Sequence, residues 1–361
     1  MSNRSRSHRC CRFNTHTCSV NMAHILAWTL LSKLACTFTD GPNFANFSHT
    51  SANPRHYLYS RVQQLGHLAK GGVFAMLPNF LIIGAPRSGT THLYRGLRQH
   101  PAVFMSDFKE PMFFAYENEP QPGVISDKNE YIALFSGAAS YQAVGEASTL
   151  YLFNEKAPGR IYRDIPKARL IAILRNPVDR AFSQYTFQRF LQTEPYETFE
   201  AALEAEDGRA QENTVSPFLL YRRVGLYGTQ IPRYLDRFSR DQILFVLQDD
   251  LDQNPNQVFH DIFAFIGVDP AFQPDLRHRT NASGIPQHDT LFRTLKLAGR
   301  TVKRLVPERW ATRLSGSAHE ALLTHPTMLD STRASLTQYF HDDIEVTQNL
   351  IGRDLSHWLA L

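Results

Sequence analysis

The stretch from Asn79 to Gln99 reads Asn-Phe-Leu-Ile-Ile-Gly-Ala-Pro-Arg-Ser-Gly-Thr-Thr-His-Leu-Tyr-Arg-Gly-Leu-Arg-Gln. Its apolar run from Phe80 to Ile83 is typical of a strand that is buried on both faces of a parallel sheet. A tight loop with two glycines follows, from Gly84 to Gly89, and the apolar spacing after Thr90 predicts a helix. A strand, a glycine loop and a helix in this order aim backbone N–H groups and the positive helix end at a phosphate.

The loop differs from the P-loop of nucleoside triphosphatases at one position. Gly84 and Gly89 have the P-loop spacing, but Thr90 stands where that motif has its lysine. The cation lies inside the loop instead, as Arg87. A triphosphatase would lose its β/γ-phosphate lysine by this change, so we expect an anion other than a magnesium-bound triphosphate. The alternative is a glycine turn that serves packing alone.

A second motif follows a second apolar run. Ala168 to Leu174 has the pattern of a buried strand, and Asn176-Pro177 is a common start of a helix because proline is tolerated in the first turn. Arg175 then ends the strand and Ser183 lies on the second turn of the helix. A guanidinium and a hydroxyl placed in this way can converge on one phosphate. The alternative is a structural arginine that caps the sheet, with a serine facing solvent.

The two motifs together resemble those of sulfotransferases that use 3′-phosphoadenosine 5′-phosphosulfate (PAPS). Gly84-Ala-Pro-Arg-Ser-Gly-Thr-Thr91 is similar to the 5′-phosphosulfate loop of that family, and Leu170 to Tyr185 is similar to its 3′-phosphate signature. The resemblance runs from about Pro78 to the C-terminus and fits the bacterial and carbohydrate-type branch. It implies a donor site that consists of Arg87, Ser88, Gly89, Thr90, Thr91, Arg175 and Ser183.

A third stretch supplies a candidate base. Lys109-Glu110-Pro111-Met112-Phe113-Phe114 is similar to the substrate loop of the family, in which the glutamate acts as the base. Pro111 predicts an extended conformation at Glu110 and therefore a loop beyond a strand end, where open α/β sheets bind ligands. The alternative is a solvated loop carboxylate that pairs with Lys109.

The resemblance implies that the chain passes a sulfuryl group from PAPS to a hydroxyl or amine of a carbohydrate or lipid-like acceptor and releases 3′-phosphoadenosine 5′-phosphate (PAP). Glu110 would take the acceptor proton. Arg87 would stabilise charge electrostatically, because an arginine does not readily give up a proton. We expect no metal. The rival hypotheses are a P-loop kinase or triphosphatase, and a nucleotide-binding module without catalysis.

The periodicity along the chain predicts an α/β fold, with a P-loop-like open parallel sheet and helices on both faces. Strands are expected at residues 80–83, 102–105, 141–147, 168–174 and 242–247. Helices are expected from Thr90 and at residues 178–190, 199–206, 226–238, 255–266 and 331–350, with a polar linker at 208–217. The resemblance implies that residues 77–361 form one sulfotransferase domain, in which the loop at 277–284 closes over the 3′-phosphate.

Composition limits the partners. A net charge of +4 over 361 residues does not indicate nucleic acid, and locally concentrated basic residues suit small anions better. All four cysteines, Cys10, Cys11, Cys18 and Cys36, precede the predicted domain and lack zinc-ligand spacing. The domain therefore needs no oxidising compartment, and a cytoplasmic location is expected. The sequence does not indicate an oligomeric state.

Residues 1–76 differ from the rest of the chain. A basic start precedes a moderately apolar stretch at residues 22–38, which carries His24 and Lys33 and lies at the short limit for a membrane span. We interpret this extension first as a disordered or mis-assigned leader, with Met22 or Met76 as the true start. A membrane anchor through residues 22–38 is the second interpretation, and a signal peptide has the same pattern.

Overall fold

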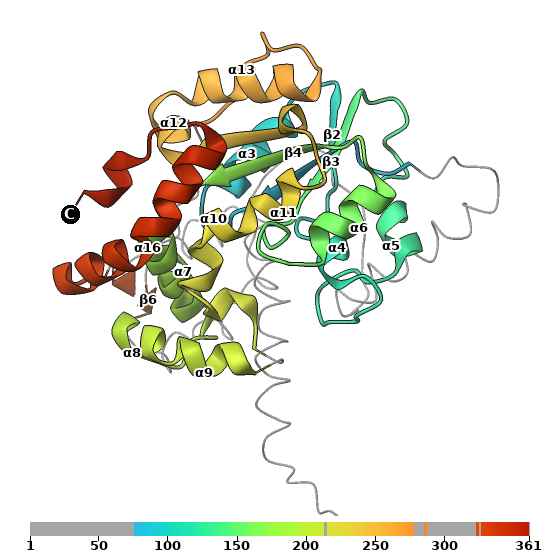
Figure 1. Cartoon of the computed structure of the whole chain (residues 1–361). Helices are drawn as coiled ribbons and strands as arrows, with labels where there is room; N and C mark the ends of the chain where they lie inside the picture. The colour runs from blue at the N-terminus through green and yellow to red at the C-terminus, as the bar shows by residue number, and fades with distance from the viewer. Residues whose placement is uncertain (1–75, 213–214, 278–284, 287–322, 325, 361) are drawn as a thin grey trace, which may run out of the picture.

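The computed structural model describes residues 76–212, 215–277, 285–286, 323–324 and 326–360. At its centre is a five-stranded parallel sheet with the order β2-β3-β1-β4-β5. The strands are β1 (Phe80–Gly84), β2 (Val103–Met105), β3 (Ala143–Ala147), β4 (Arg169–Leu174) and β5 (Ile243–Leu247). The predicted open parallel α/β sheet is confirmed (Figure 1).

The helices of the described residues are α3 (Thr90–Leu97), α4 (Phe113–Tyr116), α5 (Lys128–Ala133), α6 (Ala157–Asp164), α7 (Pro177–Leu191), α8 (Phe199–Glu204), α9 (Glu206–Gln211), α10 (Tyr227–Gln230), α11 (Pro232–Leu235), α12 (Gln248–Gln253), α13 (Pro255–Ile266) and α16 (Asp330–Ile351). Short 3-10 helices cover Pro217–Leu219, Arg223–Gly225, Arg240–Gln242 and Ser356–Leu359. A separate two-stranded antiparallel sheet pairs β6 (Ile285–Pro286) with β7 (Leu323–Thr324).

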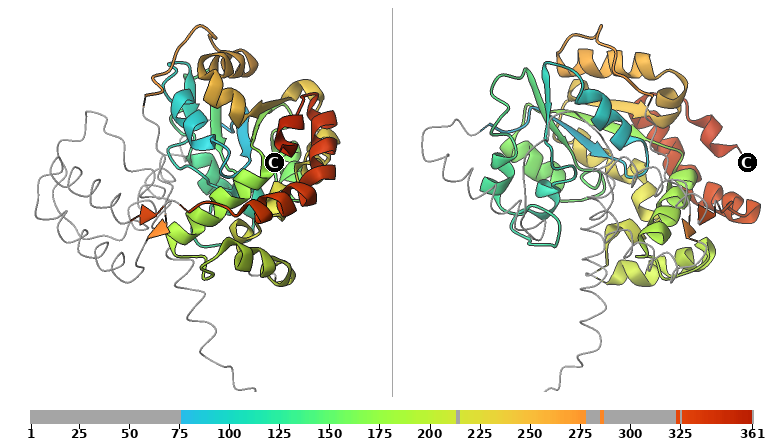
Figure 2. Two further views of the ribbon diagram at one scale, coloured as in Figure 1. Left: turned by 90° about the vertical axis from the view of Figure 1, so that its left-hand side faces the viewer. Right: turned by 180° about the vertical axis from the view of Figure 1, so that it is seen from behind.

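Helices cover both faces of the central sheet because its strands are apolar on both sides. On one face, Phe80 and Ile82 of β1 pack with the apolar residues of α3 and α13. On the other face, Leu81 and Ile83 pack with residues from α4, α6, α7, α10 and α16. Figure 1 and the views from the side and from behind in Figure 2 show α13 on one side of the sheet and α7, α10 and α16 on the other.

The chain leaves β1 and β4 toward opposite faces of the sheet. Helix α3, which follows β1, belongs to the first of these clusters, and α7, which follows β4, belongs to the second. Adjacent parallel strands whose connections diverge in this way leave a crevice beyond their carboxyl ends, where open α/β sheets bind ligands. The two predicted phosphate motifs directly follow β1 and β4, so they lie at this end of the sheet.

Two expected elements differ from the structure. The helix predicted at 226–238 is divided into α10 and α11, with Pro232 at the first position of α11, where a proline lacks the N–H that a continuous helix would need. The polar linker predicted at 208–217 is partly helical, because α9 extends to Gln211.

Several expectations concern residues outside the described ranges. These are the extension up to residue 75, with its possible anchor at 22–38, and all but Arg277 of the loop at 277–284. Across the part of the chain that the structure describes, no helix combines the length and the apolar character needed to cross a membrane.

Candidate donor and acceptor site

The loop from Gly84 to Gly89 has the close packing that explains its glycines. A Cβ on Gly84 would lie 2.7 Å from Leu152 Cβ and 3.1 Å from the Thr149 carbonyl oxygen. Gly89 has a φ of 97°, and a Cβ there would approach Leu251 and Ile173 to 3.2 and 3.3 Å. Larger residues would therefore displace the loop from the sheet.

The other predicted loop residues lie around the start of α3. Ser88 is fully buried, Thr90 is buried at the first position of the helix, and Thr91 is exposed. Gly89 precedes the helix, and its carbonyl oxygen accepts hydrogen bonds from the backbone N–H groups of His92 and Leu93. The first N–H groups of α3 therefore border the loop, as the sequence predicts for an anion site.

The Arg87 side chain extends from this loop to α7. Its Nε donates a hydrogen bond to Ser183 Oγ at 3.2 Å, and its guanidinium lies over the Phe187 ring, 4.3 Å from the ring centre. The guanidinium therefore has a fixed direction, set by a hydroxyl and an aromatic face on adjacent turns of one helix.

Arg175 connects the second motif to the first. Its Nη1 donates to the Arg87 carbonyl oxygen at 3.2 Å, while its own carbonyl oxygen accepts a hydrogen bond from the Tyr227 hydroxyl at 3.1 Å. Tyr227 is buried and packs near Trp358. The structure thus brings Arg87, Arg175 and Ser183 together.

Positive charge is concentrated at this point. Burial, and then the charges of Arg175 and Arg180, lower the pKa of Arg87 to about 10. None of the ion pairs that the described residues form with one another includes Arg87, Arg175 or Arg180. Guanidinium groups that lie close together, and that form no ion pair with a carboxylate of the described residues, are suited to an anionic ligand. The residues therefore fit a donor with several phosphate charges.

Glu110 lies in the loop between β2 and α4, with both carboxylate oxygens engaged. Oε1 pairs with Lys109 Nζ at 2.9 Å, and Oε2 accepts a hydrogen bond from Thr149 Oγ1 at 2.9 Å. The Glu110 side chain is 23% exposed, whereas that of Lys109 is only 7% exposed. The ion pair with Lys109, which belongs to the alternative interpretation of Glu110, is therefore present, but it is partly enclosed rather than fully solvated.

Thr149 lies between the Glu110 carboxylate and the start of the loop from Gly84 to Gly89. Its hydroxyl donates to Glu110, and its carbonyl oxygen is the backbone atom that closely approaches the position of a Cβ at Gly84. The Glu110 N–H also bonds to the carbonyl oxygen of Ala147, the last residue of β3. Because β1 and β3 are neighbours, the candidate base and the start of the loop lie at the same edge of the sheet.

The backbone at both candidate catalytic residues is unusual. Arg87 and Glu110 each have a φ of 66°, and Met112 has a φ of 54°. The extended conformation predicted for Glu110 is therefore wrong. The cause is tertiary: the Glu110 and Met112 N–H groups donate hydrogen bonds to Ala147 O and Ser148 Oγ, which turn the backbone around Pro111. Residues other than glycine in this left-handed region are uncommon and concentrate at functional sites.

Three contact residues were not predicted from the sequence: Thr149, Arg180 and Phe187. Thr149 follows the end of β3 by two residues, and polar side chains after parallel strands are a usable signal. Arg180 is completely buried in α7, where its Nη2 donates to the Tyr221 carbonyl oxygen. Nothing in the sequence distinguishes Arg180 from an exposed helical arginine. Nothing in the sequence predicts that the Phe187 ring contacts Arg87 either.

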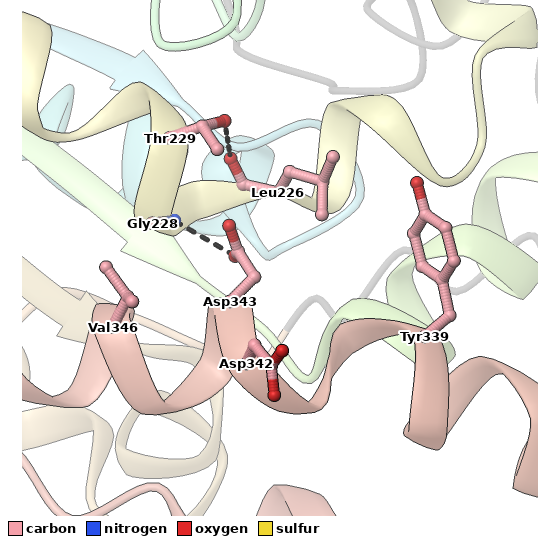
Figure 3. A pocket seen from close by; sticks show the side chains of 7 residues that line it. All are labelled: Leu226, Gly228, Thr229, Tyr339, Asp342, Asp343 and Val346. Carbon is pink, nitrogen blue, oxygen red and sulfur yellow. Dashed lines mark hydrogen bonds between the residues drawn. The ribbon is translucent and has the colours of Figure 1, made fainter.

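A separate cavity of about 450 Å³ lies between α10 and α16 (Figure 3). Its lining consists of Leu226, Gly228, Thr229, Tyr339, Asp342, Asp343 and Val346. Asp343 accepts a hydrogen bond from the Gly228 N–H, and burial raises the pKa of its carboxyl above the usual range. Two aspartates in the lining make this cavity unsuitable for a phosphate-bearing donor.

Comparison with known proteins agrees with this geometry. The model of a family described as "Sulfotransferase domain" matches residues 77–282, which include β1, the loop, Glu110 and the whole of α7. The chain belongs to this family. Both predicted phosphate motifs lie within the matched region.

Two relatives and one solved structure illustrate the similarity. The bifunctional heparan sulfate N-deacetylase/N-sulfotransferase 4 of Mus musculus is 28% identical over 78% of this chain and 31% of its own length. Carbohydrate sulfotransferase 15 of Mus musculus is 29% identical over 57% of this chain and 47% of its own length. A crystal structure of a sulfotransferase from Alicyclobacillus acidocaldarius is 32% identical, with a TM-score of 0.62, and the match covers 79% of this chain and all of that one. The matched region thus spans less than half the length of either mouse protein.

Proposed function

We propose that this chain is a sulfotransferase that moves a sulfuryl group from PAPS to a hydroxyl or amine of a carbohydrate acceptor. The observation that carries the proposal is the meeting of Arg87, Arg175 and Ser183 beyond the carboxyl ends of β1 and β4. Membership of the sulfotransferase domain family supports the same reaction.

The donor would be held by residues of both motifs. Arg87, Ser88, Gly89, Thr90 and Thr91 would bind the 5′-phosphosulfate, and Arg175 with Ser183 would bind the 3′-phosphate. The donor supplies an activated sulfuryl group, and PAP is the product released. Arg87 stays charged at neutral pH even with its pKa lowered to about 10, so it can stabilise negative charge on the departing phosphate.

The acceptor would be deprotonated by Glu110. Each carboxylate oxygen has two lone pairs, so Oε1 and Oε2 can each accept a further hydrogen bond beside those from Lys109 and Thr149. The acceptor oxygen or nitrogen forms the new bond to sulfur, its proton passes to Glu110, and the bond between sulfur and the phosphate oxygen breaks. Holding the groups in line provides much of the acceleration.

The acceptor class rests on the relatives. Their names specify an N-sulfotransferase of heparan sulfate and a carbohydrate sulfotransferase, which favours an amine or a hydroxyl of a glycan over a phenol. A lipid-like acceptor is the second candidate. The proposal involves no metal, since Arg87 and the loop N–H groups would provide the positive charge.

The experiment is sulfation with ³⁵S-labelled PAPS and a panel of acceptors. The panel contains N-desulfated heparan sulfate, chondroitin, a glycolipid, a phenol and a tyrosine peptide. Label is expected in a glycan, equally with and without EDTA. Glu110→Gln should lower turnover about 10²–10³-fold, whereas Glu155→Gln, at an exposed carboxylate paired with Arg233, should not change it.

The outcomes separate the rival functions. Binding of PAP without transfer to any acceptor would support a nucleotide-binding module. Transfer of label from γ-³²P-ATP in the presence of magnesium, with no response to PAPS, would support a kinase or triphosphatase, which family membership does not favour. Full activity of Glu110→Gln would overturn the assignment of the base.

We also propose a cytoplasmic location without a nucleic-acid partner. The absence of cysteine after Cys36 and the net charge of +4 support this part of the proposal. Fractionation of cells that express the whole chain, with and without residues 1–75, tests it. Recovery of the full chain in the membrane fraction, and of the shortened chain outside it, would support an anchor instead.

A further inference from the structure

Glu146 is a buried carboxyl group close to the turn that carries Glu110. It lies in β3, opposite Leu81 of β1, and none of its surface is exposed. None of the ion pairs among the described residues includes it. Burying a carboxyl group without a cation nearby costs free energy, and hydrogen bonds must compensate for the lost hydration. The groups that bind Glu146 therefore indicate what it holds in place.

Hydrogen bonds connect Glu146 to the turn that carries Glu110. Ser148 Oγ donates to Glu146 Oε2 at 2.8 Å and accepts a hydrogen bond from the Met112 N–H at 2.9 Å. Tyr131 OH donates to the other oxygen, Oε1, at 3.3 Å. Glu146 therefore orients the Ser148 hydroxyl, and Ser148 binds the backbone two residues after Glu110.

We propose that Glu146 is a positioning residue for the candidate base: through Ser148 it holds the strained turn from Glu110 to Met112, and it holds this turn more firmly when ionised. A bond from a hydroxyl to a carboxylate is stronger than one to a carboxylic acid. The ionised form therefore fixes Ser148, and with it Met112, more tightly. This inference rests on the proposed role of Glu110.

The surroundings of Glu146 place its titration in the working range of an enzyme. Burial raises the pKa of Glu146 to about 7, although hydrogen bonds from Tyr151, Ser148 and Tyr131 lower it, and the charge of Glu110 raises it further. The groups that face it come from separate elements: Tyr131 from α5, Tyr151 and Ser148 from the segment after β3, and Glu110 from the loop after β2. Asp164 of α6 acts on Tyr131, and Lys109 neutralises part of the Glu110 charge.

The first test is the pH profile of kcat in Glu146→Gln. Glutamine keeps an acceptor for Ser148 but cannot ionise, so it mimics the protonated glutamate. The wild-type kcat should rise through about pH 7, and the variant should lack this rise and be about fivefold slower at pH 8. Ser148→Ala should be slower at every pH by about tenfold, with the Kd for PAP unchanged in both variants.

The control is Glu206→Gln, which alters another fully buried glutamate, in α9, where it accepts hydrogen bonds from the Arg222 and Arg223 N–H groups. This variant should lose stability but keep the wild-type pH profile. An unchanged profile in Glu146→Gln, or the same altered profile in Glu206→Gln, would overturn the proposal.

The second test does not depend on activity. In protein labelled with ¹³C at the glutamate carboxyl carbons, one resonance should titrate near pH 7 and be absent from Glu146→Gln. It should titrate at lower pH in Glu110→Gln, because the neighbouring negative charge is removed. If the pH at which this resonance titrates is the same in Glu110→Gln as in the wild type, the two carboxyl groups are not coupled and the proposal is wrong. If the titration shifts as expected but the protein sulfates no acceptor, only the proposed function is contradicted.

Discussion

Arg87 Nε donates a hydrogen bond to Ser183 Oγ across 3.2 Å, although 96 positions separate the two residues in the chain. The bond joins the glycine loop after β1 to the helix after β4. It also engages the hydroxyl that the family resemblance assigns to the 3′-phosphate. Donor binding would therefore replace this internal hydrogen bond with bonds to phosphate oxygens. Because the internal bond must break first, the net binding free energy would be smaller than the new bonds alone would give.

Ser183→Ala should weaken PAP binding only modestly. The variant loses a hydroxyl hydrogen bond to a charged phosphate oxygen, worth about 1.5–3 kcal/mol, but it also frees Arg87 from its internal bond, which offsets part of this loss. Titration calorimetry should show a Kd about fivefold higher than that of the wild type. Ser140→Ala removes an exposed hydroxyl before β3 and should bind as the wild type does. A loss above a hundredfold would mean that Ser183 supports the whole loop.

Arg175→Ala should discriminate between nucleotides. A charge-assisted hydrogen bond to phosphate is worth about 1.5–3 kcal/mol, so PAP should bind about 10- to 100-fold more weakly, while AMP, which lacks the 3′-phosphate, should be less affected. Both affinities can be measured by calorimetry. Arg237→Ala, at an exposed arginine after α11, serves as the control. Equal losses for PAP and AMP would contradict the 3′-phosphate assignment.

The sequence contained enough information to predict the sheet and the two motifs. The apolar runs at β1 and β4 are bounded by Gly84 and by Asn176-Pro177, so their ends are sharply defined. Since carboxyl ends of parallel strands share one edge of a sheet, Arg87 and Arg175 could be placed together without coordinates. The bounds of α13 and α16 were also close to those expected, because Asn254-Pro255 begins α13, and Gly267 and Gly352 end the two helices in a left-handed conformation.

Contacts between distant segments could not be predicted. The approach of Thr149 to Glu110 depends on how the segment after β3 folds back past Gly84, and no local pattern encodes that path. The turn at Glu110 was predicted as extended from Pro111 alone, but Ser148 and Ala147 bind its N–H groups and impose a positive φ. Tertiary hydrogen bonds overrode the local preference there.

Gly89→Ala should impair both folding and donor binding. The φ of 97° and the approach to Leu251 and Ile173 at 3.2–3.3 Å oppose a Cβ, so we expect a loss of about 2–3 kcal/mol in unfolding free energy. PAP should bind at least tenfold more weakly because the loop is displaced. Gly352→Ala is the matched control: its φ is also positive, at 68°, but a Cβ there meets no atom within 4 Å. Urea unfolding should show a loss of about 1 kcal/mol for this control, and equal losses for both variants would contradict the packing argument.

Glu146 should make the stability of the protein depend on pH near neutrality. Its pKa is raised from 4.5 to about 7 in the folded state, so the folded protein binds more protons than the unfolded chain between these values. Its contribution to stability is therefore fully present below about pH 4.5 and is lost as the pH rises through about 7. The difference amounts to about 3 kcal/mol, at 1.36 kcal/mol for each pKa unit. Part of this difference already lies below pH 5. Between pH 5 and pH 8, the unfolding free energy from urea titrations should therefore fall by about 2.5 kcal/mol more in the wild type than in Glu146→Gln, which cannot ionise. Parallel declines in the two proteins would show that Glu146 is already ionised at pH 5, and that its burial has been compensated by Tyr131, Ser148 and Tyr151.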